Sequence, residues 1–133
     1  MVDGASRGNP GEAGCGAVIF DQTGTTLREL CRYLGHATNN VAEYEGLLMG
    51  LEEVLRLGGK RLRVESDSEL LVRQLNGLYR VKNEKLSRLH HKAVGLLRQL
   101  ERYHIIHVRR EQNRVADRLA NQAIDGAPRR LKD

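Results

Sequence analysis

The sequence predicts an α/β fold, in which helices cover both faces of a sheet that is parallel in part and antiparallel in part. Strand-like segments alternate with amphipathic helical segments along most of the chain, which is typical of such layered folds. Two strand-like segments near the N-terminus are separated by only four turn-forming residues, which indicates an antiparallel hairpin. With 133 residues, the chain fits one domain.

The hairpin is the first well-defined element. Residues 15–20 and 25–33 are rich in strand formers, and residues 21–24 between them are turn formers. Ahead of the hairpin, Asp3 precedes a glycine- and proline-rich segment, residues 4–11, which we interpret as a turn. Because only two residues come before Asp3, we expect the first strand to be very short.

The rest of the chain alternates between helices and strands. Residues 40–57 carry apolar residues at helical spacing and are followed by Gly58 and Gly59, so we expect a helix that ends there. Downstream, the pattern predicts a strand at 61–65, helices at 68–75 and 86–100, a strand at 104–109 and a helix at 113–124. The domain is therefore expected over residues 1–126, followed by a polar tail at 127–133.

Composition limits the functional classes. The sequence has no run of about 18 apolar residues, which a membrane-spanning helix would need. It also lacks an N-terminal basic segment followed by an apolar one, which would indicate secretion. We therefore expect a cytoplasmic protein. Cys15 and Cys31 fall in neighbouring predicted strands, and we favour free thiols over a bridge between them. The net charge is +5, with acidic residues dominating positions 1–72 and basic residues dominating 73–118. A basic half of this kind favours a polyanionic partner, or else it is simply a solvated helix surface.

Four carboxylates are candidate functional residues: Asp3, Glu43, Asp67 and Asp117. Taken singly, each has a simpler explanation. Asp3 suits the start of a turn, and the spacing of Asn40 and Glu43 is close to that of a capping box. Asp67 suits the N-cap of the helix that follows it, and Asp117 suits the first turn of a helix, where the dipole favours a negative charge.

What the four carboxylates share is their position at the ends of predicted elements. In a partly parallel sheet, ligands gather outside the carboxyl ends of the strands, where residues distant in sequence meet. A pocket of carboxylate oxygens is what Mg²⁺ and Mn²⁺ require. A fold that gathered the four residues would therefore form one metal site.

Four segments around these carboxylates carry a family resemblance. They are Asp3-Gly4-x-x-x-x-Asn9-Pro10-Gly11, Thr38-Asn39-Asn40-x-x-Glu43, Ser66-Asp67-Ser68 and Asn113-x-x-x-Asp117-x-Leu119-Ala120. In this order and spacing they resemble the motifs of type 1 ribonuclease H, in its compact prokaryotic branch. One such segment carries little information, whereas four in order across residues 3–120 are highly specific.

The resemblance implies a fold and an activity. The fold would be ribonuclease H-like, with three layers and a five-stranded mixed sheet. The activity would be endonucleolytic hydrolysis of the RNA strand of an RNA–DNA hybrid, leaving 5′-phosphate ends. By resemblance, Asp3, Glu43, Asp67 and Asp117 are the catalytic residues and the ligands of two divalent ions, Mg²⁺ or Mn²⁺.

The resemblance also implies contacts to the substrate. The residues concerned are Gly4, Gly8, Asn9, Asn39, Asn40, Ser68 and Asn113. Contacts to 2′-hydroxyl groups in the shallow groove would select RNA. The basic residues Arg80, Lys82, Lys85, Arg88 and Lys92 are candidates for the phosphates of the DNA strand. Double-stranded RNA is a second candidate substrate, and a monomer is expected.

Departures from the family pattern leave alternatives open. The first strand is expected to be short, and residues 109–112 contain no His where many relatives place one before the last helix. We expect Arg110 or Glu111 to contribute modestly there, and His107 to be structural. The alternatives to a ribonuclease H are a catalytically silent domain that binds hybrids or double-stranded RNA, and a nuclease of the integrase or resolvase kind. The Asn39-Asn40 pair and the turn after Gly8 favour the RNA-directed branch.

Overall fold

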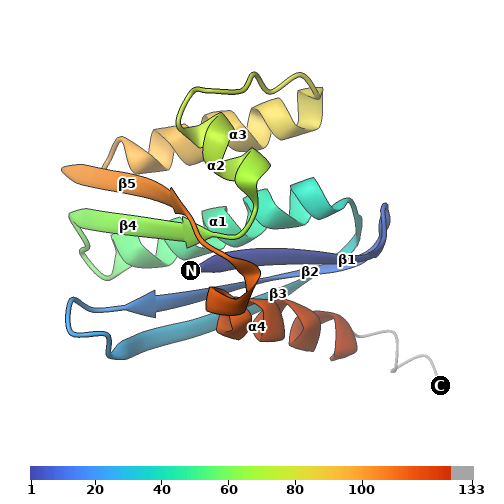
Figure 1. The fold of residues 1–133 in the computed structure, drawn as a ribbon, viewed down its shortest axis with the longest axis horizontal. Coiled ribbons are helices and arrows are strands. Elements are labelled where there is room, and N and C mark those ends of the chain that lie inside the picture. Colours follow the sequence, from blue (N-terminus) through green and yellow to red (C-terminus); the bar gives the residue numbers. More distant parts are fainter. Residues whose placement is uncertain (127–133) are drawn as a thin grey trace.

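The computed structural model describes residues 1–126 and contains a five-stranded mixed sheet with helices on both faces (Figure 1). The strand order is β3-β2-β1-β4-β5. The strands are β1 (Val2–Gly8), β2 (Gly11–Phe20), β3 (Thr26–Ala37), β4 (Arg61–Ser66) and β5 (Arg102–His107). The helices are α1 (Asn39–Arg56), α2 (Glu69–Leu75), α3 (Glu84–Leu97), the 3₁₀ turn η1 (Arg110–Gln112) and α4 (Arg114–Asp125). The predicted fold class is confirmed, whereas the predicted tail at 127–133 lies outside the described residues.

The helices are divided unequally between the faces of the sheet. Helices α1, α2 and α3 lie on one face and α4 lies on the other (Figure 1). The apolar stripe of α1, including Leu47, Leu48 and Leu51, is buried against the sheet and forms the main core with residues of β1, β2 and β4. Helix α4 packs on β2 with Leu119 in a smaller core that also contains Val18. This division leaves the C-terminal end of β4 and the first turn of α4 near the middle of the molecule.

The first strand differs from its prediction. Strand β1 is seven residues long and pairs with β2 from Val2 to Gly8, so the expectation of a very short first strand was wrong. Gly4, the first of the glycines that suggested a turn, lies inside the strand and is required by packing instead. A Cβ atom on Gly4 would lie 2.2 Å from the carbonyl carbon of Ala42 in α1, which is closer than real Cβ contacts allow. Only Asn9 and Pro10 separate β1 from β2.

Strands β1 and β4 run parallel but meet at a single residue pair within the described chain, Val2 opposite Ser66. Beyond that pair, residues of β2, β4 and α1 line a hollow of about 500 Å³. Apolar residues such as Ile19, Leu51 and Val64 line this hollow. The hollow is thus a gap in the packing of the sheet, on the opposite side of the Val2–Ser66 pair from Asp3 and Asp67.

The cysteines and the helices bear on two expectations from the composition. Cys15 is buried, Cys31 is exposed, and both are free, as predicted. Within residues 1–126, none of the helices combines the length and the apolar character that crossing a membrane would need.

Candidate active site

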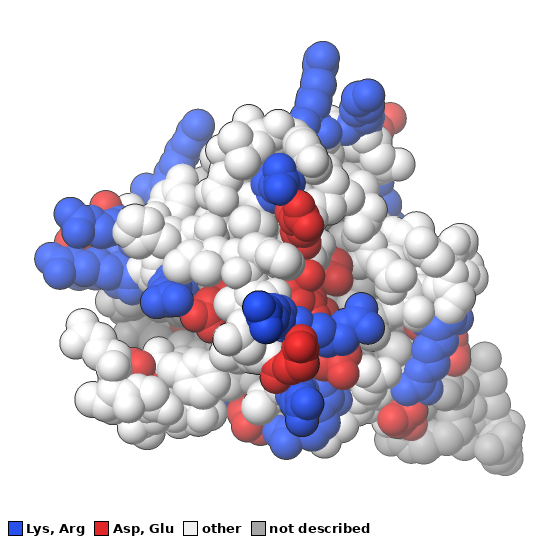
Figure 2. All heavy atoms as spheres, in the orientation of Figure 1, with Lys and Arg blue, Asp and Glu red and all other residues white. Residues whose placement is uncertain are grey.

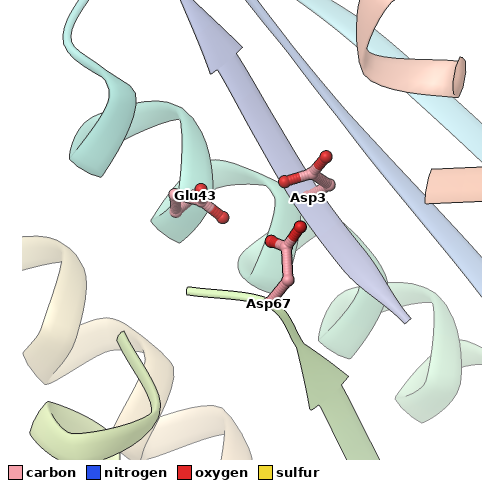
Figure 3. Close-up of side chains that lie close together, drawn as sticks. All are labelled: Asp3, Glu43 and Asp67. Atoms are coloured by element: carbon pink, nitrogen blue, oxygen red, sulfur yellow. The ribbon is translucent and has the colours of Figure 1, made fainter. Parts of the chain in front are cut away.

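Three of the four candidate carboxylates lie together. Asp3 comes from β1, Glu43 from α1 and Asp67 from the residue just after β4, and their side chains point toward one another (Figure 3). One carboxylate oxygen of each residue lies within 4.8 Å of the others. The three carboxylates come from three different elements, so the fold, and not the local sequence, brings them together.

The backbone explains why these three side chains meet. The Val2–Ser66 pair of the parallel strands places the following residues, Asp3 and Asp67, side by side. Helix α1 passes very close to β1, because a Cβ atom on Gly46 would lie 2.7 Å from the carbonyl oxygen of Asp3. The same close approach at Gly4 brings β1 against the backbone around Glu43. Glycine at these two positions therefore lets the cluster form.

Asp117 lies at the edge of this cluster. It is exposed, in the first turn of α4, as the sequence predicted. It is close enough to Asp3 for a side-chain hydrogen bond and its charge to contribute to the raised pKa of Asp3. The side-chain amide of Asn121 donates to the backbone carbonyl of Asp117 at 3.0 Å, one helical turn away. The structure thus places Asp117 beside Asp3 and outside the tight group of three.

The capping explanations for Glu43 and Asp67 do not hold. Thr38 is the N-cap of α1, and its hydroxyl accepts from the backbone N–H of Val41 at 3.2 Å. Ser68 is the N-cap of α2 and accepts from Leu71 in the same way. Neither carboxylate therefore has a capping role that would account for its position.

The cluster is electrostatically unfavourable without a cation. Burial, together with the charges of Asp67 and Asp117, raises the pKa of Asp3 to about 8. Burial, then the charges of Asp3 and Asp67, raises the pKa of Glu43 to about 9. The Oε2 atom of Glu43 is buried and has no hydrogen-bond partner among the described residues. Buried, crowded carboxylate oxygens of this kind fit a divalent metal ion, which would neutralise them.

One basic side chain reaches this cluster from the last connection. The guanidinium Nε of Arg110 lies 3.9 Å from Oδ2 of Asp67, although the Arg110 side chain is 89% exposed. Its charge also partly offsets the rise in the pKa of Glu43. Arg110 lies in η1, in the connection that the sequence showed to lack a His. His107 ends β5, in agreement with the prediction that it lies in a strand.

The asparagines predicted to contact substrate lie at the turn between β1 and β2 and at the start of α1. The side-chain oxygen of Asn9 accepts from the backbone N–H of Asn39 at 3.1 Å, so this contact joins the two segments. Asn9, Asn39 and Asn40 are all exposed. Gly8 has a φ of +100°, which only glycine adopts without strain. These residues are placed where a bound molecule could reach them.

The other two side chains predicted to bind substrate have different surroundings. The hydroxyl of Ser68 accepts from the first turn of α2, and its backbone N–H donates to Oγ of Ser66 at 3.0 Å. Asn113 is fully buried, and its side-chain amide donates to the backbone carbonyl of Val2 at 2.9 Å. Burial removes the Asn113 side chain from any surface contact. We therefore correct its predicted role as a substrate contact.

A second hollow was not predicted as a site. It measures about 540 Å³ and lies beside the turn at Asn9, where the first turns of α1 and α3 converge. Its lining includes both N-cap residues, Thr38 and Asn83, together with His36 and Lys85. The sequence signal was the capping pattern at each helix start. Only the fold shows that the two starts face one hollow.

Charges of both signs meet on the face that Figure 1 presents. Figure 2 shows Asp and Glu side chains gathered near the middle of this face, with Lys and Arg side chains bordering them. Of the basic residues assigned to the DNA strand, Lys85 lines the second hollow and Arg88 is paired with Glu84 at 3.2 Å. The arrangement suits a polyanion: basic side chains at the rim would hold some of its phosphates, while another part of its backbone reaches the acidic centre.

Comparisons with known proteins agree with this geometry. The bifunctional protein Rv2228c of Mycobacterium tuberculosis is 46% identical over 127 residues, which cover 95% of this chain but 35% of that protein. The chain thus spans about a third of the length of the mycobacterial relatives that it matches. The solved N-terminal RNase H domain of Rv2228c has a TM-score of 0.91 at 46% identity and covers 93% of this chain, which in turn covers 95% of it.

Two further solved structures are similar over nearly their whole length. RNase H1 of Halobacterium salinarum has a TM-score of 0.92 at 40% identity, with 95% of this chain and 96% of that chain covered. LC11-RNase H1, solved in complex with an RNA/DNA hybrid, has a TM-score of 0.89 at 43% identity, with 93% and 94% covered. The family model described as reverse transcriptase-like matches residues 1–123. The chain therefore belongs to the reverse transcriptase-like family, in its ribonuclease H branch.

Proposed function

We propose that this protein is a divalent-metal-dependent endoribonuclease that hydrolyses the RNA strand of RNA–DNA hybrids. The observation that carries the proposal is the cluster of Asp3, Glu43 and Asp67, with Asp117 beside it. The pKa of Asp3 is raised to about 8 and that of Glu43 to about 9, as expected for metal ligands in the absence of a cation. The presence of the same fold in a ribonuclease H1 bound to an RNA/DNA hybrid supports the choice of substrate.

Each carboxylate has a defined task in this proposal. Asp3, Glu43, Asp67 and Asp117 would hold two ions, Mg²⁺ or Mn²⁺. When bound, two such ions supply an activated water and stabilise the leaving oxygen in an in-line displacement at phosphorus. Asp3 and Glu43 release the protons that they hold in the metal-free protein, so metal affinity rises with pH up to about 9. Arg110 beside Asp67 moderates the negative charge before a cation binds.

Recognition of RNA would come from the exposed asparagines. Asn9, Asn39 and Asn40 offer amide donors and acceptors near the start of α1, which also carries Glu43. Such groups recognise 2′-hydroxyls, which DNA lacks. The bond from Asn39 to Asn9 fixes the two segments relative to each other, which lowers the entropy lost when substrate binds.

The second hollow would hold a phosphate of the DNA strand. The N-cap residues of α1 and α3 line it, so the positive ends of two helix dipoles lie beside it. The hydroxyl of Thr38 and the ammonium of Lys85 add a donor and a charge. A phosphate bound there would hold one strand of the hybrid while the acidic cluster acts on the other strand.

A substrate panel tests this function. An RNA–DNA hybrid, a DNA duplex and an RNA duplex, each labelled on one strand, are incubated with the protein in Mg²⁺, in Mn²⁺ and in EDTA. We expect the RNA strand of the hybrid to be cut into products with 5′-phosphates, and EDTA to prevent cutting. Tight binding of the hybrid without cutting in either metal would instead identify the silent binding domain. Cutting of double-stranded RNA, a monomeric state and a cytoplasmic location stay predictions from the sequence.

A further inference from the structure

A buried polar contact lies directly behind the acidic cluster and joins β1, β4 and α4. Val2 and Ser66 are the single residue pair between β1 and β4 in the described chain, and the amide of Asn113 donates to the carbonyl of Val2 at 2.9 Å. We call these three residues the central node. All three are buried, and Ser66 and Asn113 are fully so.

Each residue of the central node is close in sequence to one carboxylate. Asp3 follows Val2, and Asp67 follows Ser66. Asp117 lies one helical turn after Asn113, and its backbone N–H donates to the Asn113 carbonyl at 3.1 Å. A shift of α4 against β1 would therefore change the separation of Asp117 from Asp3.

Asn113 occupies this node at a cost to local stability. It is the N-cap residue of α4, yet its side chain makes no capping hydrogen bond, although an Asn at this position usually does. Its Oδ1 atom is buried and unpartnered within residues 1–126. An unsatisfied buried acceptor destabilises the folded state. Departures of this kind from the locally favoured arrangement tend to occur at functional sites.

We propose that Asn113 is a positioning residue, which sets the distance between Asp3 and Asp117 by tying α4 to the backbone just before Asp3. The inference rests on the proposed metal-dependent function and adds a residue that touches neither substrate nor metal. Mg²⁺ requires near-octahedral oxygen ligands at about 2.0–2.1 Å, so small displacements of a carboxylate weaken binding. Contacts that orient metal ligands typically change metal affinity or activity about 10–100-fold when they are removed.

The test separates positioning from stability with Asn113→Ser. A serine offers α4 a capping hydroxyl, which the Asn113 side chain does not provide, but it is too short to reach the Val2 carbonyl, so the tie is lost. We expect the melting temperature in EDTA to change little and Mn²⁺ binding, measured by calorimetry on the substrate-free protein, to weaken by about 10-fold or more. The Mg²⁺ concentration for half-maximal cleavage should rise in parallel. Asn113→Ala, which removes the tie without offering a cap, should show the same loss of Mn²⁺ affinity.

A matched control is available at the end of α2. The amide of Asn76 donates to the backbone carbonyl of Ile105 at 3.2 Å, so it also ties a helix end to a strand, away from the carboxylates. Asn76→Ser should leave Mn²⁺ affinity unchanged. Wild-type affinity in Asn113→Ser, or an equal loss in Asn76→Ser, would overturn the positioning role. If the wild type binds Mn²⁺ but cuts no hybrid, the proposed function fails while the comparison of Mn²⁺ affinities still decides the role of Asn113.

Discussion

Replacing Glu43 with Gln is expected to stabilise the metal-free protein and to abolish its response to metal. Burial and neighbouring charges raise the pKa of Glu43 from an ordinary 4.5 to about 9. The folded state therefore holds a proton at pH 7 that the unfolded state has released. pH 7 lies about 2.5 units above the unfolded-state pKa of 4.5, and each unit corresponds to about 1.4 kcal/mol. Keeping Glu43 protonated in the folded state therefore lowers the free energy of unfolding at pH 7 by up to roughly 3 kcal/mol. An amide of the same shape carries no such cost.

The sign of the pH dependence follows from the same shift. Because the folded-state pKa lies above the unfolded-state value, the contribution of Glu43 to stability is full below about pH 4.5 and is lost as pH rises toward 9. Asp3, with its pKa raised to about 8, acts in the same direction. The metal-free wild type should therefore lose stability between pH 5 and pH 9, and Glu43→Gln should lose less.

Urea unfolding at about pH 5, 7 and 9 measures both effects, in EDTA and in excess Mn²⁺. The wild type should gain about 2.7 kcal/mol from metal at 100 times its dissociation constant, and Glu43→Gln should gain almost nothing. Glu52→Gln, at an exposed position on the same helix, is the control and should match the wild type. The reasoning is refuted if metal-free Glu43→Gln is less stable than the wild type at pH 8, or if both proteins show the same pH slope.

Three further perturbations test other parts of the structure. Gly4→Ala should lower both the melting temperature and Mn²⁺ affinity, because its Cβ would lie 2.2 Å from the carbonyl carbon of Ala42; an unchanged calorimetric titration would contradict this. Four residues added ahead of Met1, with apolar side chains at the first and third positions before Met1, should fill the 500 Å³ hollow. We expect this extension to raise the free energy of unfolding by about 2 kcal/mol. Shifting that pattern by one residue should remove the gain. Lys85→Ala should weaken hybrid binding and reduce the salt slope by about 1, whereas Lys60→Ala should not, as a filter-binding series at several salt concentrations would show.

Helical periodicity was a reliable guide because it reflects burial of one face. The helix predicted at 40–57 is α1, Asn39–Arg56, and its apolar stripe is the one that packs on the sheet. The last helix was predicted at 113–124 and runs from Arg114 to Asp125. In both cases the amphipathic pattern alone defines the element to within a residue or two.

Strand β1 was mispredicted because a glycine serves equally well in a local turn and at a close contact with a distant helix. Glycine in sequence suggests a turn, yet Gly4 lies inside a strand where α1 leaves no space for a side chain. The contact that imposes this lies about 40 residues away in the chain, at Ala42. No pattern within the segment itself could reveal it.

Some features of the candidate site were predicted from the sequence, and others depend on the fold. The motifs identified the four carboxylates, and the fold brings Asp3, Glu43 and Asp67 together, with Asp117 beside them. The role of Asn113 could not be predicted, because its partner is a backbone carbonyl 111 residues away. The second hollow likewise depends on how two helix starts are placed, which capping patterns alone do not determine.

The acidic cluster is the catalytic centre in the proposed function. The most direct measurement is the rate at which Asp67→Asn cuts the labelled RNA strand of a hybrid in saturating Mg²⁺, compared with the wild type. We expect the rate to fall by more than about 100-fold, since a ligand should matter more than the contacts that orient it, with the far-ultraviolet circular dichroism unchanged. A folded Asp67→Asn protein that cuts the hybrid at the wild-type rate would contradict the account.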